Sequence, residues 1–335
     1  DIAAYAKNDP YDMYHPSVNY ANMMMKDNMS FSRVNLSSSG GSDRVQYFSY
    51  LGYTGEGDIY KLGAKADYNR LNARSNIDIE INDVLKAQFD FFGALTFRRS
   101  PNYGWDPEFT SEGTDNPVLT ITEMPSVLSH ITTVSPIAYP VYAKNDPSLE
   151  KPWYAVSPTY TENPVGNLVH NGYYIETGRN GTFNVALDYD MKGFVEGLKS
   201  RTYLGFSAFN LIRVGKAEDY IAYTVTPSVT TAGKDTILLK KVHDGVDQAD
   251  QAKLHDFYSQ RWAFYESLTY SREFGNNHVQ GAFSYYLSKA SRNGIEEPQR
   301  QMITSFTALY SYKDKYNVHG RSEEHTSELQ SPNTI

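Results

Sequence analysis

The chain has 335 residues, with 31 Lys and Arg against 39 Asp and Glu and a net charge of -8, and it carries 28 Tyr and 16 Phe. Its mean hydropathy is -0.55, and no run approaches the roughly 18 apolar residues of a membrane-spanning helix. The absence of Cys excludes disulfide frameworks, thiolate metal sites and cysteine nucleophiles. The negative charge is dispersed and no basic stripe is present, so the sequence shows no footprint for nucleic acid. A chain of this kind can span a membrane only as a β-barrel.

Alternation of apolar and polar side chains predicts long antiparallel strands along most of the chain. It is plainest from residue 77 to residue 97, where odd positions are mostly apolar and even positions mostly polar, across a tight reversal at Asn82-Asp83. Strands with one apolar and one polar face suit a transmembrane barrel, with lipid outside and a polar lumen inside. We expect strands at about 29–39, 44–54, 66–81, 84–98, 172–190, 199–213, 258–274, 278–290 and 299–313.

The connections between these strands alternate between short and long. In an up-and-down barrel alternate connections share a rim, so the short turns all fall on one side, as in outer-membrane barrels. Gly178-Arg179-Asn180-Gly181 resembles a hairpin turn that would invert this order, and we interpret it as a bulge or kink within one strand. The predicted fold class is all-β, a partial antiparallel up-and-down transmembrane β-barrel of about nine strands.

The same alternation fits a large soluble β-sandwich or propeller, whose strands are also half-buried. A propeller would repeat at roughly 40 residues, and the sequence shows no such period. Two functions therefore remain open. One is an outer-membrane transporter whose apolar strand faces contact lipid, and the other is a soluble β-rich carbohydrate-binding module or glycan-active enzyme that buries the same faces in a core.

Catalytic signatures are lacking. Eight His are scattered without the i, i+4 spacing of a zinc helix, and no Asp-rich calcium loop is present. We therefore predict no catalytic residues, no metal site, no cofactor and no enzymatic activity.

The long connection at 99–171 is the predicted site of ligand or partner contacts, because aromatic faces stack on sugar rings or anchor a partner protein. Packing of these rings against the loop itself is the alternative. The candidate residues are Tyr103, Trp105, Tyr139, Tyr142, Trp153, Tyr154 and Tyr160.

Several segments together resemble SusC/RagA-type TonB-dependent outer-membrane receptors, in order from about Asp12 to Gly320. They are residues 34–48 (VNLSSSGGSDRVQYF), 51–53 (LGY), 68–77 (YNRLNARSNI), 81–86 (INDVLK), 163–165 (NPV) and 197–199 (GLK). The resemblance implies a barrel of about 22 strands with an N-terminal plug in the outer membrane of a Gram-negative cell. It also implies import of glycans or peptides with a SusD-like surface lipoprotein, energised by a TonB complex that acts on the plug.

Against that pattern, residues 1–28 are expected to be an external loop segment before the second barrel strand. Residues 29–320 are expected to form the partial barrel, with long loops at 99–171 and 214–257, and the plug is expected to be missing. Residues 321–335 (RSEEHTSELQSPNTI) resemble translated sequencing-adapter read-through, and we expect a non-native tail outside the fold. The alternative is a genuine polar tail, which would be disordered.

Overall fold

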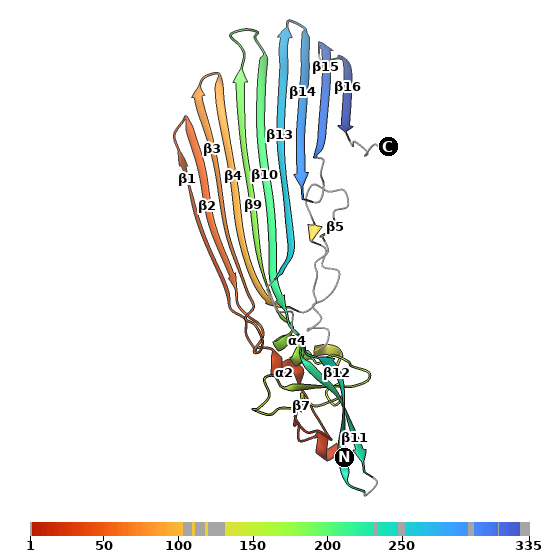
Figure 1. The fold of residues 1–335 in the computed structure, drawn as a ribbon. Helices are drawn as coiled ribbons and strands as arrows, with labels where there is room; N and C mark the ends of the chain where they lie inside the picture. The colour runs from red at the N-terminus through yellow and green to blue at the C-terminus, as the bar shows by residue number, and fades with distance from the viewer. Residues whose placement is uncertain are drawn as a thin grey trace, which may run out of the picture.

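The computed structural model describes residues 2–102, 109–110, 118–119, 131–230, 233–246, 252–293, 298–313 and 315–328. Within them, ten long strands form one sheet, in the order β1-β2-β3-β4-β9-β10-β13-β14-β15-β16 (Figure 1). A smaller sheet has the order β12-β11-β8-β7, and β5 (Phe109–Thr110) pairs with β6 (Val118–Leu119).

The described helices are α1 (Ile2–Tyr5), α2 (Tyr20–Met24) and α4 (Pro164–His170). The long strands are β1 (Phe31–Gly41), β2 (Val45–Glu56), β3 (Asp67–Asn82), β4 (Leu85–Pro101), β9 (Gly172–Asp190), β10 (Leu198–Ala217), β13 (Ala252–Phe274), β14 (Asn277–Arg292), β15 (Gln299–Tyr312) and β16 (Tyr316–Glu328). The short strands are β7 (Tyr142–Lys144), β8 (Trp153–Val156), β11 (Ile221–Val229) and β12 (Asp235–Asp244).

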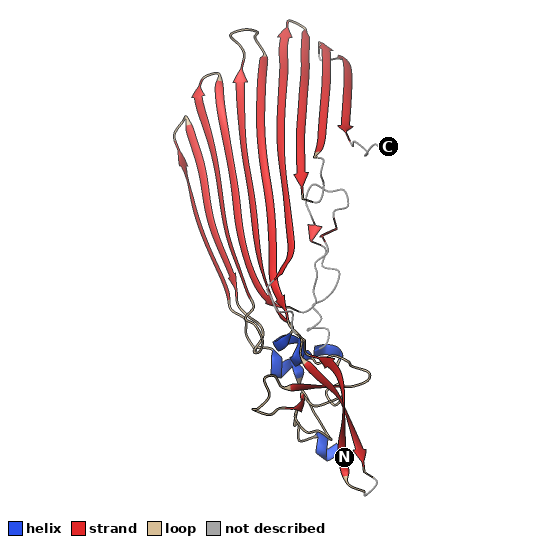
Figure 2. Ribbon diagram, in the orientation of Figure 1, coloured by secondary structure: helices blue, strands red, loops and turns tan. Residues whose placement is uncertain are grey.

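The large sheet is an up-and-down antiparallel arrangement, as predicted. Short turns join neighbouring strands at one end, and the long connections, with the helices and the small sheet, gather at the other (Figure 2). We call this second end the long-loop rim. The strands run farther toward it than expected: β4 reaches Pro101, β10 reaches Ala217 and β13 begins at Ala252, so the long connections start at 102 and 218.

Strand β9 is continuous through Gly178 and Gly181, which confirms that this segment is not a hairpin turn. The expected bulge there is wrong, since β9 keeps an unbroken register with both β4 and β10. The register shifts of the large sheet lie elsewhere, between Arg213 and Val214 of β10 and between Glu80 and Asn82 of β3. Glycine lets the backbone adopt turn conformations but does not require them, and two flanking ladders hold it extended.

The reversal between β3 and β4 lies one residue later than predicted. Asn82 is the last residue of β3, and its side-chain oxygen accepts hydrogen bonds from the backbone N–H groups of Val84 (3.0 Å) and Leu85 (2.9 Å). An asparagine that bonds the backbone two residues ahead closes a tight turn by itself. The turn residues are therefore Asp83 and Val84.

Residues 321–328 continue β16 and pair with residues 300–307 of β15. The expectation that they lie outside the fold is wrong for this stretch, because an edge strand pairs through its backbone and tolerates most side chains. Their character still changes at Gly320. Tyr316 and Val318 share a face with Tyr310 of β15, whereas Ser322 and Glu324 occupy that same face farther along. A non-native origin for these residues stays a prediction.

The register places apolar and polar side chains on opposite faces of the sheet. Phe91, Phe183, Phe206 and Trp262 lie directly opposite one another on β4, β9, β10 and β13. Directly opposed residues share a face, so they form one row on what we call the apolar face. Phe183 keeps 47% of its surface exposed and Trp262 keeps 56%. Lys86, Asp188 and Arg201 form a corresponding row on the polar face.

The principal hydrophobic core lies away from the large sheet, among the segments at the long-loop rim. This position fits a sheet whose apolar face contacts a medium other than its own chain. None of the described helices has the length and apolar character needed to cross a membrane.

Candidate functional site

Four separate segments fold together at the long-loop rim into a small domain that we call the cap. They are residues 2–30, 57–66, 131–171 and the described part of 218–246, namely 218–230 and 233–246. Strand β11 pairs in parallel with β8, opposite Tyr154, Ala155 and Val156, and β8 pairs with β7. The connection after β4 and the connection after β10 therefore build one sheet, which neither could complete alone.

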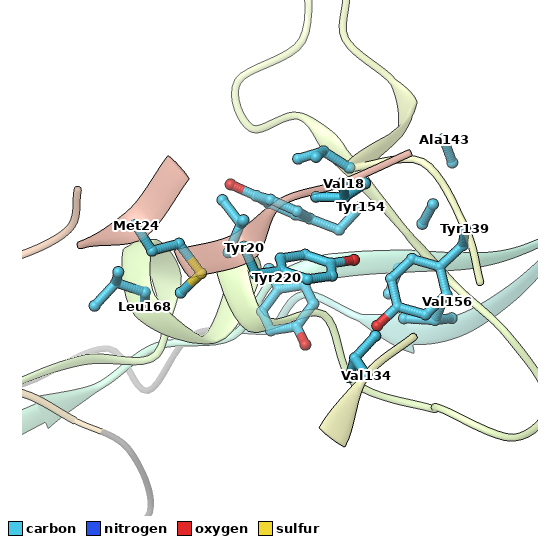
Figure 3. Packing of buried hydrophobic residues seen from close by; sticks show 14 of the residues in the cluster. Val18, Tyr20, Met24, Val134, Tyr139, Ala143, Tyr154, Val156, Leu168 and Tyr220 are labelled. Carbon is cyan, nitrogen blue, oxygen red and sulfur yellow. The ribbon is translucent and has the colours of Figure 1, made fainter. Parts of the chain in front are cut away.

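Buried side chains from all four cap segments form a common core (Figure 3). Val18, Tyr20 and Met24 come from the N-terminal segment, and Tyr60 comes from the β2–β3 connection. The remaining members come from the two long connections: Val134, Tyr139, Val141, Ala143, Tyr154, Ala155, Val156, Val165, Leu168, Tyr220 and Ala222. A contiguous core of this kind makes the cap a packed unit rather than a set of independent loops.

Asn163 is the polar centre of the cap. As the N-cap of α4, its side-chain oxygen accepts from the backbone N–H groups of Val165 (2.9 Å) and Gly166 (3.2 Å). Its side-chain amide donates to the carbonyls of Val141 (3.1 Å) and Ala155 (2.8 Å). The side chain is fully buried and makes all four bonds, so it ties α4 to the small sheet.

Tyr220 connects the second long connection to the same centre. Its hydroxyl accepts from the backbone N–H of Asn163 (3.0 Å) and donates to the side-chain oxygen of Asn167 (2.8 Å). Tyr139 similarly donates to the carbonyl of Glu162 (2.8 Å). Burial raises the pKa of the Tyr139, Tyr154 and Tyr220 hydroxyls above the ordinary value of 10.0, which keeps them neutral and able to donate.

The N-terminal segment is fastened to the β2–β3 connection by backbone contacts. Met25 and Tyr60 form an isolated bridge, and the backbone N–H of Lys61 donates to the carbonyl of Met24 at 2.8 Å. Gly63 has a φ of +83°, and a Cβ added there would lie 2.3 Å from the Leu168 carbonyl oxygen. Only glycine therefore lets this connection pack so closely against α4.

The predicted contact residues differ in how far they are buried in the cap. Tyr103 and Trp105 lie outside the described residues. Tyr139 and Tyr154 are core residues, and their rings have no accessible face for a ligand. Tyr142, Trp153 and Tyr160 pack against the core and remain partly exposed. The two buried rings therefore pack within the cap itself. Each of the other three rings packs against the core with one part of its surface and exposes another part.

Two aromatic stacks at the cap surface include predicted residues. Tyr142 stacks on Tyr11 with ring centroids 5.8 Å apart and nearly parallel planes. Trp153 stacks on Tyr223 at 4.7 Å, and the Lys144 ammonium lies 5.2 Å from the Trp153 ring centroid. Partly exposed flat rings beside a cation can stack on a sugar or anchor a protein partner.

Sequence reasoning missed the residues that position these rings, namely Asn163, Tyr220, Tyr11 and Tyr223. A signal for Asn163 existed, because an Asn directly before Pro164 at the start of an apolar stretch is a helix N-cap pattern. Nothing local pointed to Tyr220, whose partners lie more than 50 positions away in the chain.

The polar face of the large sheet carries ion pairs rather than a binding centre for metal. Arg201 contacts both carboxylate oxygens of Asp188 at 2.9 Å and donates to Gln88 at 2.8 Å. Nearer the cap, Arg213 donates to Glu176 at 2.6 Å, and the two side chains are only 3% and 13% exposed. Within the described part of the chain, no group of three or more His, Asp or Glu side chains could hold a metal ion.

Known structures have a similar fold. The structure of the RagAB peptide transporter matches with a TM-score of 0.55 and 13% identity, over 96% of this chain and 36% of that chain. The RagAB peptide importer in the 'open-open' state matches with a TM-score of 0.53 and 13% identity, over 93% of this chain and 34% of the other. The fold is that of a partial outer-membrane β-barrel.

At 13% identity these matches establish the fold alone, and this chain spans about a third of the length of the matched chains. The matched proteins are described as a transporter and an importer of peptides. No family model matches the sequence, and no curated protein matches it either.

Proposed function

We propose that this chain belongs to a TonB-dependent outer-membrane receptor of the SusC/RagA type, which actively imports oligosaccharides or peptides. The observation that carries the proposal is the exposed apolar face of the large sheet, which is continuous across β4, β9, β10 and β13. A soluble protein of this size would rarely leave so large an apolar surface uncovered. In a bilayer that surface would contact lipid, which avoids the unfavourable exposure of apolar side chains to water.

The proposed receptor has a defined orientation, because the short turns lie at one end of the large sheet, which we call the short-turn rim, and the cap lies at the other. Outer-membrane barrels have short turns on the periplasmic side and long loops outside the cell. The cap would therefore face the medium, and the polar face with Arg201, Asp188, Arg213 and Glu176 would line the lumen. TonB would act from the opposite side, through a plug domain.

The aromatic stacks of the cap support contacts with the substrate or with a SusD-like surface lipoprotein. Tyr142 and Trp153 lie on neighbouring strands β7 and β8 and keep accessible ring surface. Their support by the buried core fixes the rings in place, which lowers the entropy cost of binding. We extend no such role to the buried Tyr139 and Tyr154.

Cell fractionation followed by uptake measurements tests this function. The product of the complete gene should be recovered from outer membranes only with detergent, and cells should take up labelled peptides or oligosaccharides until the proton-motive force is collapsed. Trp153→Ala should reduce uptake, whereas Tyr14→Ala, at an exposed cap residue outside both stacks, should not. An intact fold that stays soluble without detergent would instead support the carbohydrate-binding module or glycan-active enzyme.

A further inference from the structure

The apolar face contains a trough of small side chains across four strands. Ala73, Gly93, Gly181 and Ala208 lie directly opposite one another on β3, β4, β9 and β10. They belong to the lining of a cavity of about 450 Å³. With neighbouring strands about 4.8 Å apart, the four residues span roughly 14 Å across the sheet.

Larger side chains form the two walls of the trough. Phe91, Phe183 and Phe206 make up the row on the short-turn side, and the Phe91 ring lies over Gly93, 3.1 Å from where a Cβ would be. Leu71 and Leu95 begin the row on the long-loop side. A Cβ on Gly181 would meet nothing within 4 Å, so the middle of the trough is open.

The row of larger side chains on the long-loop side of the trough includes a positively charged residue, Arg179. Arg179 and Asn210 continue the row of Leu71 and Leu95, and the Arg179 guanidinium donates to the Asn210 side-chain oxygen at 3.0 Å. Asn210 is neutral, so this bond leaves the charge of the guanidinium uncompensated. Among the described residues, no carboxylate forms an ion pair with Arg179, which is itself exposed.

The height of Arg179 on the sheet matches the edge of a bilayer. Arg179 and Tyr189 lie ten positions apart on β9 and share the apolar face. Ten residues rise about 33 Å along a strand, which becomes about 25 Å along the membrane normal at a tilt of roughly 40°, the height of a lipid-facing band. Tyr258, opposite Asn210, adds an aromatic residue at the Arg179 level, as expected at an interface.

We propose that this trough binds one lipid with an anionic, phosphate-bearing headgroup, whose acyl chain lies over Gly93 and Gly181 and whose phosphate meets Arg179. Bulk lipid tails are as apolar as the walls, so hydrophobicity alone gives no preference for this position. The recess adds packing contacts that a flat surface lacks, and guanidinium pairs with phosphate in a bidentate manner. The inference rests on the proposed membrane location of the apolar face.

The fluorescence of Trp262 can report on a lipid bound in the trough. It ends the row of Phe91, Phe183 and Phe206, with its ring centroid 4.3 Å from that of Phe206. A bromine-labelled acyl chain quenches tryptophan fluorescence only on contact. The experiment places the complete gene product in phosphatidylcholine bilayers that contain brominated phosphatidylglycerol or, separately, brominated phosphatidylcholine with the same chains. The Trp262→Phe variant identifies the Trp262 signal.

Brominated phosphatidylglycerol should quench Trp262 at about one fifth of the mole fraction that brominated phosphatidylcholine requires, as expected for one cation near an anionic lipid. Arg179→Gln should abolish this preference and leave quenching by phosphatidylcholine intact. Gly181→Leu, which fills the trough without a backbone clash, should weaken quenching by both lipids. Gly281→Leu is the matched control on the same face, and it should behave as the unmodified protein does.

Equal quenching by the two lipids, or a preference that survives Arg179→Gln, would overturn the lipid site and leave the transporter proposal standing. Absence of quenching by either lipid would overturn both, because Trp262 would then not face the bilayer. A free phosphate site is distinguished by adding inorganic phosphate, which should not restore Trp262 fluorescence if a lipid is the occupant.

Discussion

The backbone N–H of Asn163 donates to the hydroxyl of Tyr220 across 3.0 Å, although 57 positions separate the two residues in the chain. This bond joins the connection after β4 to the connection after β10. The parallel pairing of β8 with β11 repeats the same link in the backbone. The cap therefore forms only when both long connections are in place, and it should gain or lose its structure as one unit.

Asn163→Ala should destabilise the cap strongly, because it removes an N-cap and the two buried hydrogen bonds that the side-chain amide donates to the carbonyls of Val141 and Ala155. We expect a loss of about 2 to 3 kcal/mol in the free energy of cap unfolding. Limited proteolysis of the folded protein measures it as earlier cleavage in the cap.

Asn19→Ala is the matched control, since Asn19 is the exposed N-cap of α2 and accepts one backbone bond, from Asn22 at 3.0 Å. It should cost about 1 kcal/mol or less. Equal proteolysis of the two variants would contradict the central role of Asn163.

Gly63→Ala should separate the β2–β3 connection from α4. The added methyl group would meet the Leu168 carbonyl at 2.3 Å in a left-handed backbone that alanine disfavours. We expect destabilisation of more than about 1 kcal/mol, measured as a lower midpoint of thermal unfolding of the cap. Gly193→Ala at the short-turn rim, where a Cβ meets nothing within 4 Å, should leave that midpoint unchanged.

Phe183→Lys should prevent stable membrane assembly, because it puts a charge in the middle row of the apolar face. The expected cost is about 2 to 4 kcal/mol, detected as loss of the folded, heat-modifiable form on gel electrophoresis. Thr182→Lys places the same charge one residue away on the polar face and should assemble. Comparable loss in both variants would argue against lipid contact at Phe183.

Alkaline pH should destabilise the cap through its buried tyrosines. Burial raises the pKa of Tyr139, Tyr154 and Tyr220, so the folded cap retains protons that the unfolded chain releases above the ordinary pKa of 10.0. Their contribution is complete below pH 10 and falls above it by about 1.4 kcal/mol per pH unit for each tyrosine. Tyrosinate absorbance should rise together with cap unfolding, and independent titration of all tyrosines near pH 10 would contradict the burial.

The large sheet could be predicted because its information is local. Alternation such as Phe183, Val185 and Leu187 defines both the strand and its apolar face, and each short turn sets the pairing of the two strands that it joins, such as β9 with β10. The cap could not be predicted in this way. Strands β8 and β11 are short and pair in parallel across about 70 residues of chain. The local sequence of either strand therefore does not predict that it pairs with the other.

The role of the aromatic residues in ligand or partner contacts stays a prediction, and their burial could not be predicted from the sequence. Among the described aromatic residues of the 99–171 connection, burial separates Tyr139 and Tyr154 from the partly exposed Tyr142 and Trp153. That division depends on packing partners such as Tyr220, which come from another connection. The end of the sheet shows the converse limit, since β16 pairs through Glu328 although its side chains lose the apolar pattern after Gly320.

The most direct test of the account is a spin-label accessibility scan along β9. This chain contains no Cys, so in the complete gene product, with any Cys outside this chain replaced, single cysteines at positions 182–188 can each carry a nitroxide. In bilayers, labels at 183, 185 and 187 should contact dissolved oxygen in the lipid, and labels at 182, 184, 186 and 188 should contact a water-soluble relaxation agent. A two-residue alternation in this phase is the predicted result. Uniform access to the aqueous agent, or the opposite phase, would contradict a membrane-spanning sheet with its apolar face toward lipid.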